Sequence, residues 1–129
     1  MEVPKNAISV TGYWTWMGED GIMRTKVKPN IEITLTLAIE NTNAVNSFYT
    51  DKKFPILIDS RGIKSMSREA REHFSARGRD PKTNAFGIII KSPLSRVIGN
   101  FFLGLNKPAV PTRLFDNEND AIEWLNKLK

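Results

Sequence analysis

The sequence of 129 residues contains no cysteine and a single histidine, His73. The absence of cysteine excludes disulfides and thiolate metal sites. A lone histidine, without partners at helical or hairpin spacing, does not form a histidine metal site, and its charged neighbours place His73 on an exposed helix surface. We therefore expect no metal and no other cofactor, and the lack of disulfides is typical of a cytoplasmic protein.

Long apolar runs are also missing. The longest are Phe86 to Ile90 and Phe101 to Leu105, whereas a membrane-spanning helix needs roughly 20 apolar residues. The first residues, Met1 to Asn6, lack the apolar segment of a secretory signal. We expect no membrane span, and the length suits a single domain over residues 1–129.

Catalytic motifs are absent as well. The sequence has no Gly-x-Ser-x-Gly elbow and no glycine-rich phosphate loop after a predicted strand. Asp59, Ser92 and Lys107-Pro108 resemble the signature of phosphorylated receiver domains, but Lys107-Pro108 precedes the last predicted strand and the acidic pair after the first strand is missing. An enzyme is the least favoured class, with Asp59 as its one suitably placed carboxylate.

The N-terminal part predicts a β-hairpin. Residues alternate from Ile8 to Met17, turn residues follow at 18–21, and Ile22 to Val27 can return as the second arm. One face of the first arm should carry Ile8, Val10, Gly12, Trp14 and Trp16. The two tryptophans need cover, either from helices of the same chain or from a second copy in a homodimer.

The following segment is ambiguous at its start. Ile31 to Thr34 is rich in β-branched residues and suits a strand, but later apolar residues recur at helical spacing. We predict a helix from Leu35 to Phe48, capped by Thr34 or Thr36. Its expected inner face consists of Leu35, Ala38, Ile39, Thr42, Val45 and Tyr49.

The second half alternates strands with helices. The predicted strands are Phe54–Asp59, Ala85–Ile90 and Val110–Phe115, and Pro111 in the last indicates either an edge strand or the start of a strand. The predicted helices begin near Ser67, near Ser92, and at Asp116 or Asn117, and residues 60–66 are a predicted loop. This alternation implies parallel strands. We predict an α/β domain with a mixed, mainly parallel central sheet, an N-terminal β-hairpin and about four helices.

Basic residues outnumber acidic ones, with a net charge of +5 and a pI of about 9.6. Residues 61–82 alone carry +4. Nucleic-acid binding is disfavoured because Phe74, Phe101 and Phe102 fall on predicted buried faces and not on a stacking platform. Interleaved acids in residues 61–82 are also typical of a solvated helix face.

A candidate site lies where the first of the three strands ends. Open α/β sheets build sites at the carboxyl ends of their strands, and the free N–H groups of the next helix attract anions. The candidate surface for a ligand or partner consists of Asp59, Arg61, Ser67, Arg68, Arg71 and Arg96. Alternatively, Asp59 and Ser67 satisfy amides of the loop and the helix cap.

Residues 56–128 resemble the SpoIIAA-like branch of the STAS and SEC14-like domains. The resemblance rests on Leu57-Ile58-Asp59-Ser60-Arg61-Gly62, Met66 with Glu69-Ala70-Arg71, Ser95 to Phe102, Thr112 to Phe115, and Glu118, Ala121 and Trp124-Leu125. Antagonists of anti-sigma factors in this family carry an Asp-Ser-Ser-Gly-like motif with a phosphorylated serine. This sequence has Met66-Ser67-Arg68-Glu69 in that place, so the motif is absent.

The resemblance implies a non-catalytic regulatory or protein-interaction module of a bacterial cytoplasm, whose partner is another protein. The SEC14-like connection implies binding of an apolar ligand. The alternative function is therefore a small-ligand-binding domain, in which a nucleotide or lipid binds at the helix N-terminus near Ser67.

Overall fold

The fold is described by a computed structural model that covers residues 1–77, 83–91 and 110–129. The predicted helix that begins near Ser92 and the candidate residue Arg96 lie outside the described residues.

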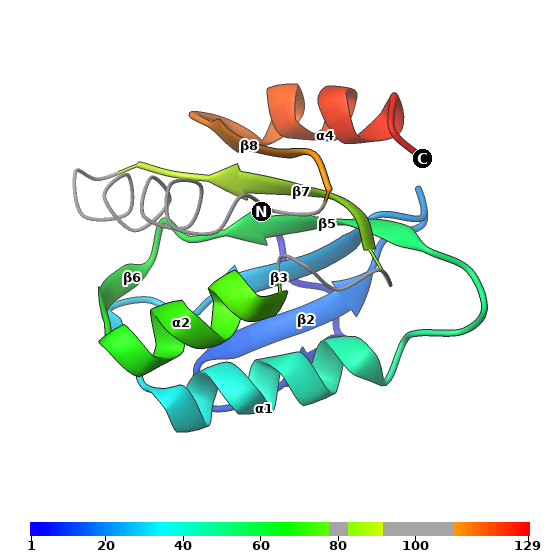
Figure 1. The fold of residues 1–129 in the computed structure, drawn as a ribbon. Helices are drawn as coiled ribbons and strands as arrows, with labels where there is room; N and C mark the ends of the chain where they lie inside the picture. The colour runs from blue at the N-terminus through cyan, green and yellow to red at the C-terminus, as the bar shows by residue number, and fades with distance from the viewer. Residues whose placement is uncertain (78–82, 92–109) are drawn as a thin grey trace.

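A six-stranded sheet forms the centre of the domain (Figure 1). Its order is β1-β2-β3-β5-β7-β8. These strands are β1 (Ile8–Ser9), β2 (Tyr13–Met17), β3 (Met23–Val27), β5 (Phe54–Asp59), β7 (Thr83–Ile89) and β8 (Thr112–Phe115). The first three pair antiparallel, and β3, β5, β7 and β8 pair parallel. The predicted mixed, mainly parallel sheet is therefore confirmed, with β8 at its edge.

The predicted first arm of the hairpin is not one strand. The chain reverses after β1, so that Ile8 pairs with Thr15 and Ser9 with Trp14, and the N–H of Val10 donates to the carbonyl of Tyr13 at 3.0 Å. The predicted shared face was therefore wrong, because alternation continues across the turn while the chain direction changes.

The two tryptophans of β2 are covered to different degrees. Trp16 is 7% exposed and belongs to the core. Trp14 is half-buried, and the ammonium groups of Lys26 and Lys28 lie 5.9 and 5.3 Å from its ring centroid. Much of the cover that these rings need thus comes from the same chain.

A second, two-stranded sheet pairs β4 (Ile31–Ile33) in parallel with β6 (Ile63–Met66). Residues 63–66 were predicted as loop, and that prediction was wrong. Lys64 is exposed and Ser65 half-buried, so the strand lacks the apolar run that would reveal it. Its pairing partner lies some thirty residues away in the sequence, which local patterns do not report.

Three helices are described: α1 (Leu35–Asn46), α2 (Arg68–Arg77) and α4 (Glu118–Asn126). Thr34 and Asn117 cap α1 and α4 by accepting from the N–H groups of Leu37 and Asp120. Each helix begins at a residue with a hydroxyl or amide acceptor, as N-cap preferences dictate. None of the described helices is long and apolar enough to cross a bilayer.

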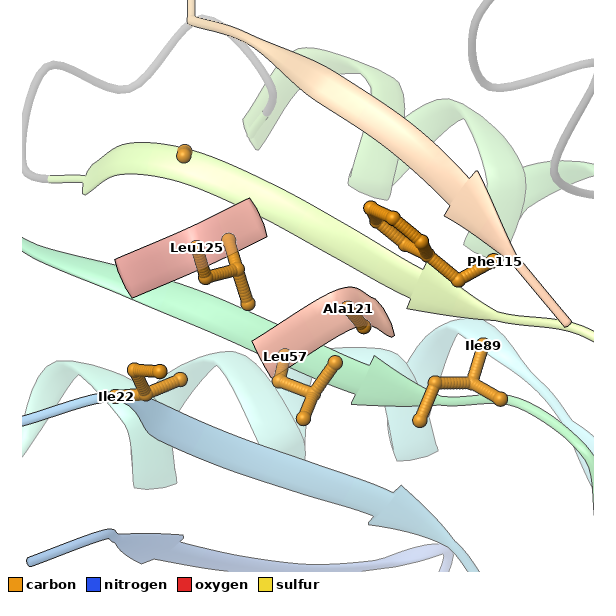
Figure 2. Packing of buried hydrophobic residues seen from close by; sticks show 7 residues of the cluster. Ile22, Leu57, Ile89, Phe115, Ala121 and Leu125 are labelled. Atoms are coloured by element: carbon orange, nitrogen blue, oxygen red, sulfur yellow. The ribbon is translucent and has the colours of Figure 1, made fainter. Parts of the chain in front are cut away.

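The sheet is covered on both faces. Figure 1 shows α1 and α2 on one side and α4 on the other. Leu57 and Ile89 pack with Ala121 and Leu125 of α4 (Figure 2). On the opposite face, Ile56 and Phe86 pack with Val45 of α1. These apolar contacts on the two faces of the sheet fix the order of the layers.

The buried face of α1 includes a polar residue. The Nδ2 group of Asn41 donates to the hydroxyls of Thr15 and Thr25, each at 2.8 Å, and the two hydroxyls are 2.9 Å apart. All three side chains are at most 3% exposed. The helix is turned so that Ala38, Asn41, Ala44 and Val45 face the sheet.

This rotation corrects the predicted inner face of α1. Ala38 and Val45 are buried as expected, but Leu35 is 39% and Ile39 41% exposed. His73 also departs from the expected exposed position: it is half-buried, with Nε2 2.7 Å from the hydroxyl of Thr42 on α1.

Replacement of Asn41 by alanine should lower the free energy of unfolding by about 1–3 kcal/mol, because it leaves two buried hydroxyls with fewer partners. Urea denaturation measures this loss. Asn43→Ala, at an exposed position of the same helix, controls for helix propensity and should change stability by no more than about 0.5 kcal/mol. Equal losses in the two variants would contradict a stabilising role for the Asn41 cluster.

Candidate functional site

The carboxyl ends of the parallel strands meet at one edge of the sheet. β3, β5, β7 and β8 all end there, because they are parallel and in register from Lys26 and Asp59 to Ile89 and Phe115. Figure 1 shows β6 and the first turns of α1 and α2 at the same edge, on the left of the view. The predicted candidate residues that are described all come from this part of the fold.

Asp59 and Arg61 form a two-point ion pair at the end of β5. Nε and Nη2 of Arg61 donate to the two carboxylate oxygens of Asp59 at 2.9 and 2.8 Å, and the N–H of Arg61 donates at 3.1 Å. Asp59 is 2% exposed, whereas Arg61 is 31% exposed. The carboxylate therefore lies beneath the guanidinium, and only Arg61 reaches solvent from this pair.

The environment of Asp59 acts on its pKa in two directions. Burial raises the pKa, but the hydrogen bonds and positive charge of Arg61 outweigh burial, so the pKa lies below its ordinary value. The hydrogen bonding of the Arg61 guanidinium to Asp59 in turn raises the pKa of Arg61. Asp59 is thus a charged carboxylate held by its neighbour, and it is not arranged as a proton donor at neutral pH.

The remaining loop residues fix the course of the chain. The N–H and hydroxyl of Ser60 both donate to the carbonyl of Ile89, at 3.1 and 2.7 Å. A Cβ atom on Gly62 would lie 3.0 Å from the carbonyl oxygen of Val27, and the Gly62 carbonyl accepts from the N–H of Asn30 at 2.7 Å. A side chain has no room at this close approach of two backbones.

Ser67 begins α2 as predicted. Its hydroxyl accepts from the N–H of Ala70 at 3.2 Å, which satisfies one of the free donors of the first turn. Its own N–H donates to the carbonyl of Ile33 at 2.9 Å. Because Ile33 precedes the cap residue Thr34 of α1, the β4–β6 pair aligns the starts of the two helices.

The other candidate arginines lie on α2. Arg68 is 78% exposed and its Nε donates to Glu72 at 3.0 Å, while Arg71 is half-buried. Four residues of β6, about 13 Å of strand, separate them from the Asp59–Arg61 pair. The fold places all these residues at one edge. The side chains of Asp59 and Arg61 are paired there, and the N–H of Arg71 donates to the carbonyl of Ser67 at 3.0 Å.

Two apolar residues at this edge were not expected there. Leu35 and Ile39 are the large hydrophobic side chains most open to solvent among the described residues. They stand four residues apart on α1, so they share one face of the helix. Leu35 and Arg68 are the first residues of two neighbouring helices.

Within residues 1–77, 83–91 and 110–129, no group of three potential metal ligands comes together.

Replacement of Arg61 by glutamine should lower the free energy of unfolding at pH 7 by about 1–3 kcal/mol, because it leaves a buried carboxylate without its charged donor. Arg68→Gln, which breaks an exposed pair, should cost at most about 1 kcal/mol. Urea denaturation at pH 7 compares the two variants.

The pH dependence of the free energy of unfolding, measured for wild type and Arg61→Gln, tests whether the pairing of Asp59 with Arg61 causes this loss. A carboxyl whose pKa is lowered by folding stabilises the protein above its unfolded value of about 3.9, and this contribution disappears as the pH falls through the folded pKa. Without Arg61, burial remains and raises the pKa of Asp59. The difference in the free energy of unfolding between wild type and Arg61→Gln should therefore become smaller as the pH falls from 7 to 4. A difference that stays constant would contradict a stabilising pair between Asp59 and Arg61.

Two solved structures are similar to this chain across nearly its whole length. One is an uncharacterised protein of the DUF3478 family with a SpoIIAA-like fold from Shewanella loihica, with a TM-score of 0.64 and 18% identity. The other is an anti-sigma factor antagonist from Mycobacterium paratuberculosis, with a TM-score of 0.66 and 20% identity. Each comparison covers 92% of this chain and 98% of the other.

The predicted resemblance is thereby confirmed for the fold. A search among curated proteins gave no match. A family model described as a domain of unknown function, DUF7793, matches residues 15–129. The chain therefore belongs to the DUF7793 family and has the SpoIIAA-like fold of STAS domains.

Proposed function

We propose that the chain is a non-catalytic regulatory module that binds another protein. The binding surface is the helix-start surface, formed by Leu35 and Ile39 of α1 with Arg68 and Arg71 of α2. The observation that carries the proposal is the exposure of two large apolar side chains on α1, together with an exposed arginine in the first turn of α2, the helix that packs against α1. Interfaces commonly combine an apolar centre with arginine and a polar rim.

The other candidate residues have structural roles that account for their presence. Asp59 holds Arg61 and the loop, and Ser67 caps α2. Leu35 and Ile39 differ from these residues, since exposing apolar surface loses the stabilisation that burial would provide. A partner that covers these side chains recovers that stabilisation.

The kind of partner is suggested by a structural relative. The similar chain from Mycobacterium paratuberculosis is named as an anti-sigma factor antagonist, a name that denotes action on another protein. Arg61 and Arg96 are further proposed members of the surface. A nucleotide or lipid at the start of α2 stays an alternative prediction, and it has only the helix N-terminus and its arginines in its favour.

Replacement of Arg68 by glutamate should weaken partner binding at least about fivefold, because it reverses a charge at the edge of the interface. Proteins captured from extract by the immobilised wild-type chain are identified, and the affinity of each purified candidate is then measured for wild type and variant. Leu35→Asp, at the apolar part of the surface, should weaken the same partner by a larger factor.

The matched control is Lys127→Glu. Lys127 forms an exposed ion pair with Glu123 four residues away on α4, as Arg68 does with Glu72 on α2. The change in net charge is identical, so non-specific attraction to acidic proteins would respond equally in both variants. A partner whose affinity is unaffected by Arg68→Glu and Leu35→Asp would exclude the helix-start surface.

A further inference from the structure

A hollow of about 420 Å³ lies at the opposite edge of the sheet from the candidate site. It is found where β2 ends, β3 begins and the chain enters β5 after α1. Its apolar floor is formed by Met17, Phe48, Phe54 and Pro55. β5 has six residues and a length of about 20 Å, so this hollow is separate from the helix-start surface.

The floor of the hollow is held in place by its neighbours. The ring of Phe54 stacks on that of Tyr49, with centroids 4.7 Å apart and planes inclined by 11°. The hydroxyl of Tyr49 lies 2.9 Å from that of Thr83 at the start of β7. Phe54 is 8% exposed and belongs to the core. The hollow is therefore preformed, and binding there would cost little ordering of the floor.

The rim of the hollow is positively charged. Lys52, Lys53 and Lys129 line it, and its lining contains no acidic residue. The nearby carboxylate of Asp20 is engaged by both Nη groups of Arg24, at 2.8 and 2.9 Å. Lys52 and Lys53 are exposed, so their ammonium groups can reach a ligand that sits on the apolar floor.

We propose that this hollow binds a small amphiphile with one anionic group, such as a medium-chain carboxylate. The apolar body would lie against Phe48 and Phe54, and the anion would meet Lys52 and Lys53. The volume is near the lower end of the range of about 300–1,000 Å³ for ligand sites, which suits a single short chain or ring better than a two-chain lipid. The charge of the rim selects an anion over a cation or a neutral molecule.

Titration of the full chain with decanoate, below its micelle concentration, tests the proposal. Backbone amide resonances of residues 17–21 and 48–55 should shift with saturation, while those of residues 59–70 should not. The double variant Lys52→Glu with Lys53→Glu should bind at least about tenfold more weakly, because it turns an attractive rim into a repulsive one. Lys5→Glu with Lys64→Glu changes the net charge by the same amount at two exposed positions that do not line the hollow, and this variant should bind within about twofold of wild type.

Three results would overturn the proposal. One is the absence of saturable shifts at the hollow, and another is an equal loss of affinity in the two double variants. The third is tight binding of either of two further probes. These are acetate, which has the anion without the chain, and decyltrimethylammonium, which has the chain with the opposite charge. Either probe binding as tightly as decanoate would show that the combination of apolar floor and cationic rim is not recognised.

Discussion

Burial of β5 on both faces is the constraint on which the rest of the structure depends. Leu57 packs toward α4 and Ile56 toward α1, so the strand has no face that could meet water. It must therefore lie inside the sheet, where β3 and β7 pair with it in parallel. The parallel pairing brings the loop after Asp59 to the same edge as the helix starts, and it leaves the entry to β5 at the other edge.

The elements that the sequence predicts well are those whose signals are local. The continuous apolar run of β5 and the caps at Thr34 and Ser67 depend on residues a few positions apart, and each was found as expected. β6 was missed because its pairing with β4 is non-local. The face of α1 was partly wrong because hydrophobicity favours burying Leu35 and Ile39, whereas Asn41 satisfies two buried threonines instead. The sequence signal that could have revealed the true buried face of α1 was Asn41, a polar residue on the same helical face as Ala38 and Val45.

The same distinction applies to the candidate site. Asp59, Ser60, Gly62 and Ser67 stand out in the sequence because loops and caps require these residue types, and the structure gives each a hydrogen-bonding or steric reason. The two-point pair of Asp59 with Arg61 was not expected, since a spacing of two residues does not reveal that both side chains turn back together. The residues by which the sequence reveals the fold thus have their hydrogen-bonding and steric roles within the fold itself. The exposure of Leu35 and Ile39, in contrast, became visible only with the orientation of α1.

The exposed aliphatic pair has a physical origin in the Asn41 cluster. At 3.6 residues per turn, residues 35 and 39 lie roughly 120° and 160° around the helix axis from Asn41, so a rotation that buried Leu35 would withdraw Asn41 from Thr15 and Thr25. Those hydroxyls lie opposite one another on β2 and β3, where water cannot replace the amide, and leaving such groups unpaired costs more than exposing part of two aliphatic side chains. The buried polar contact of Asn41 therefore keeps Leu35 and Ile39 partly exposed on another part of the helix surface. That coupling explains why two large aliphatic side chains stay exposed while Ala38 and Val45 of the same helix are buried.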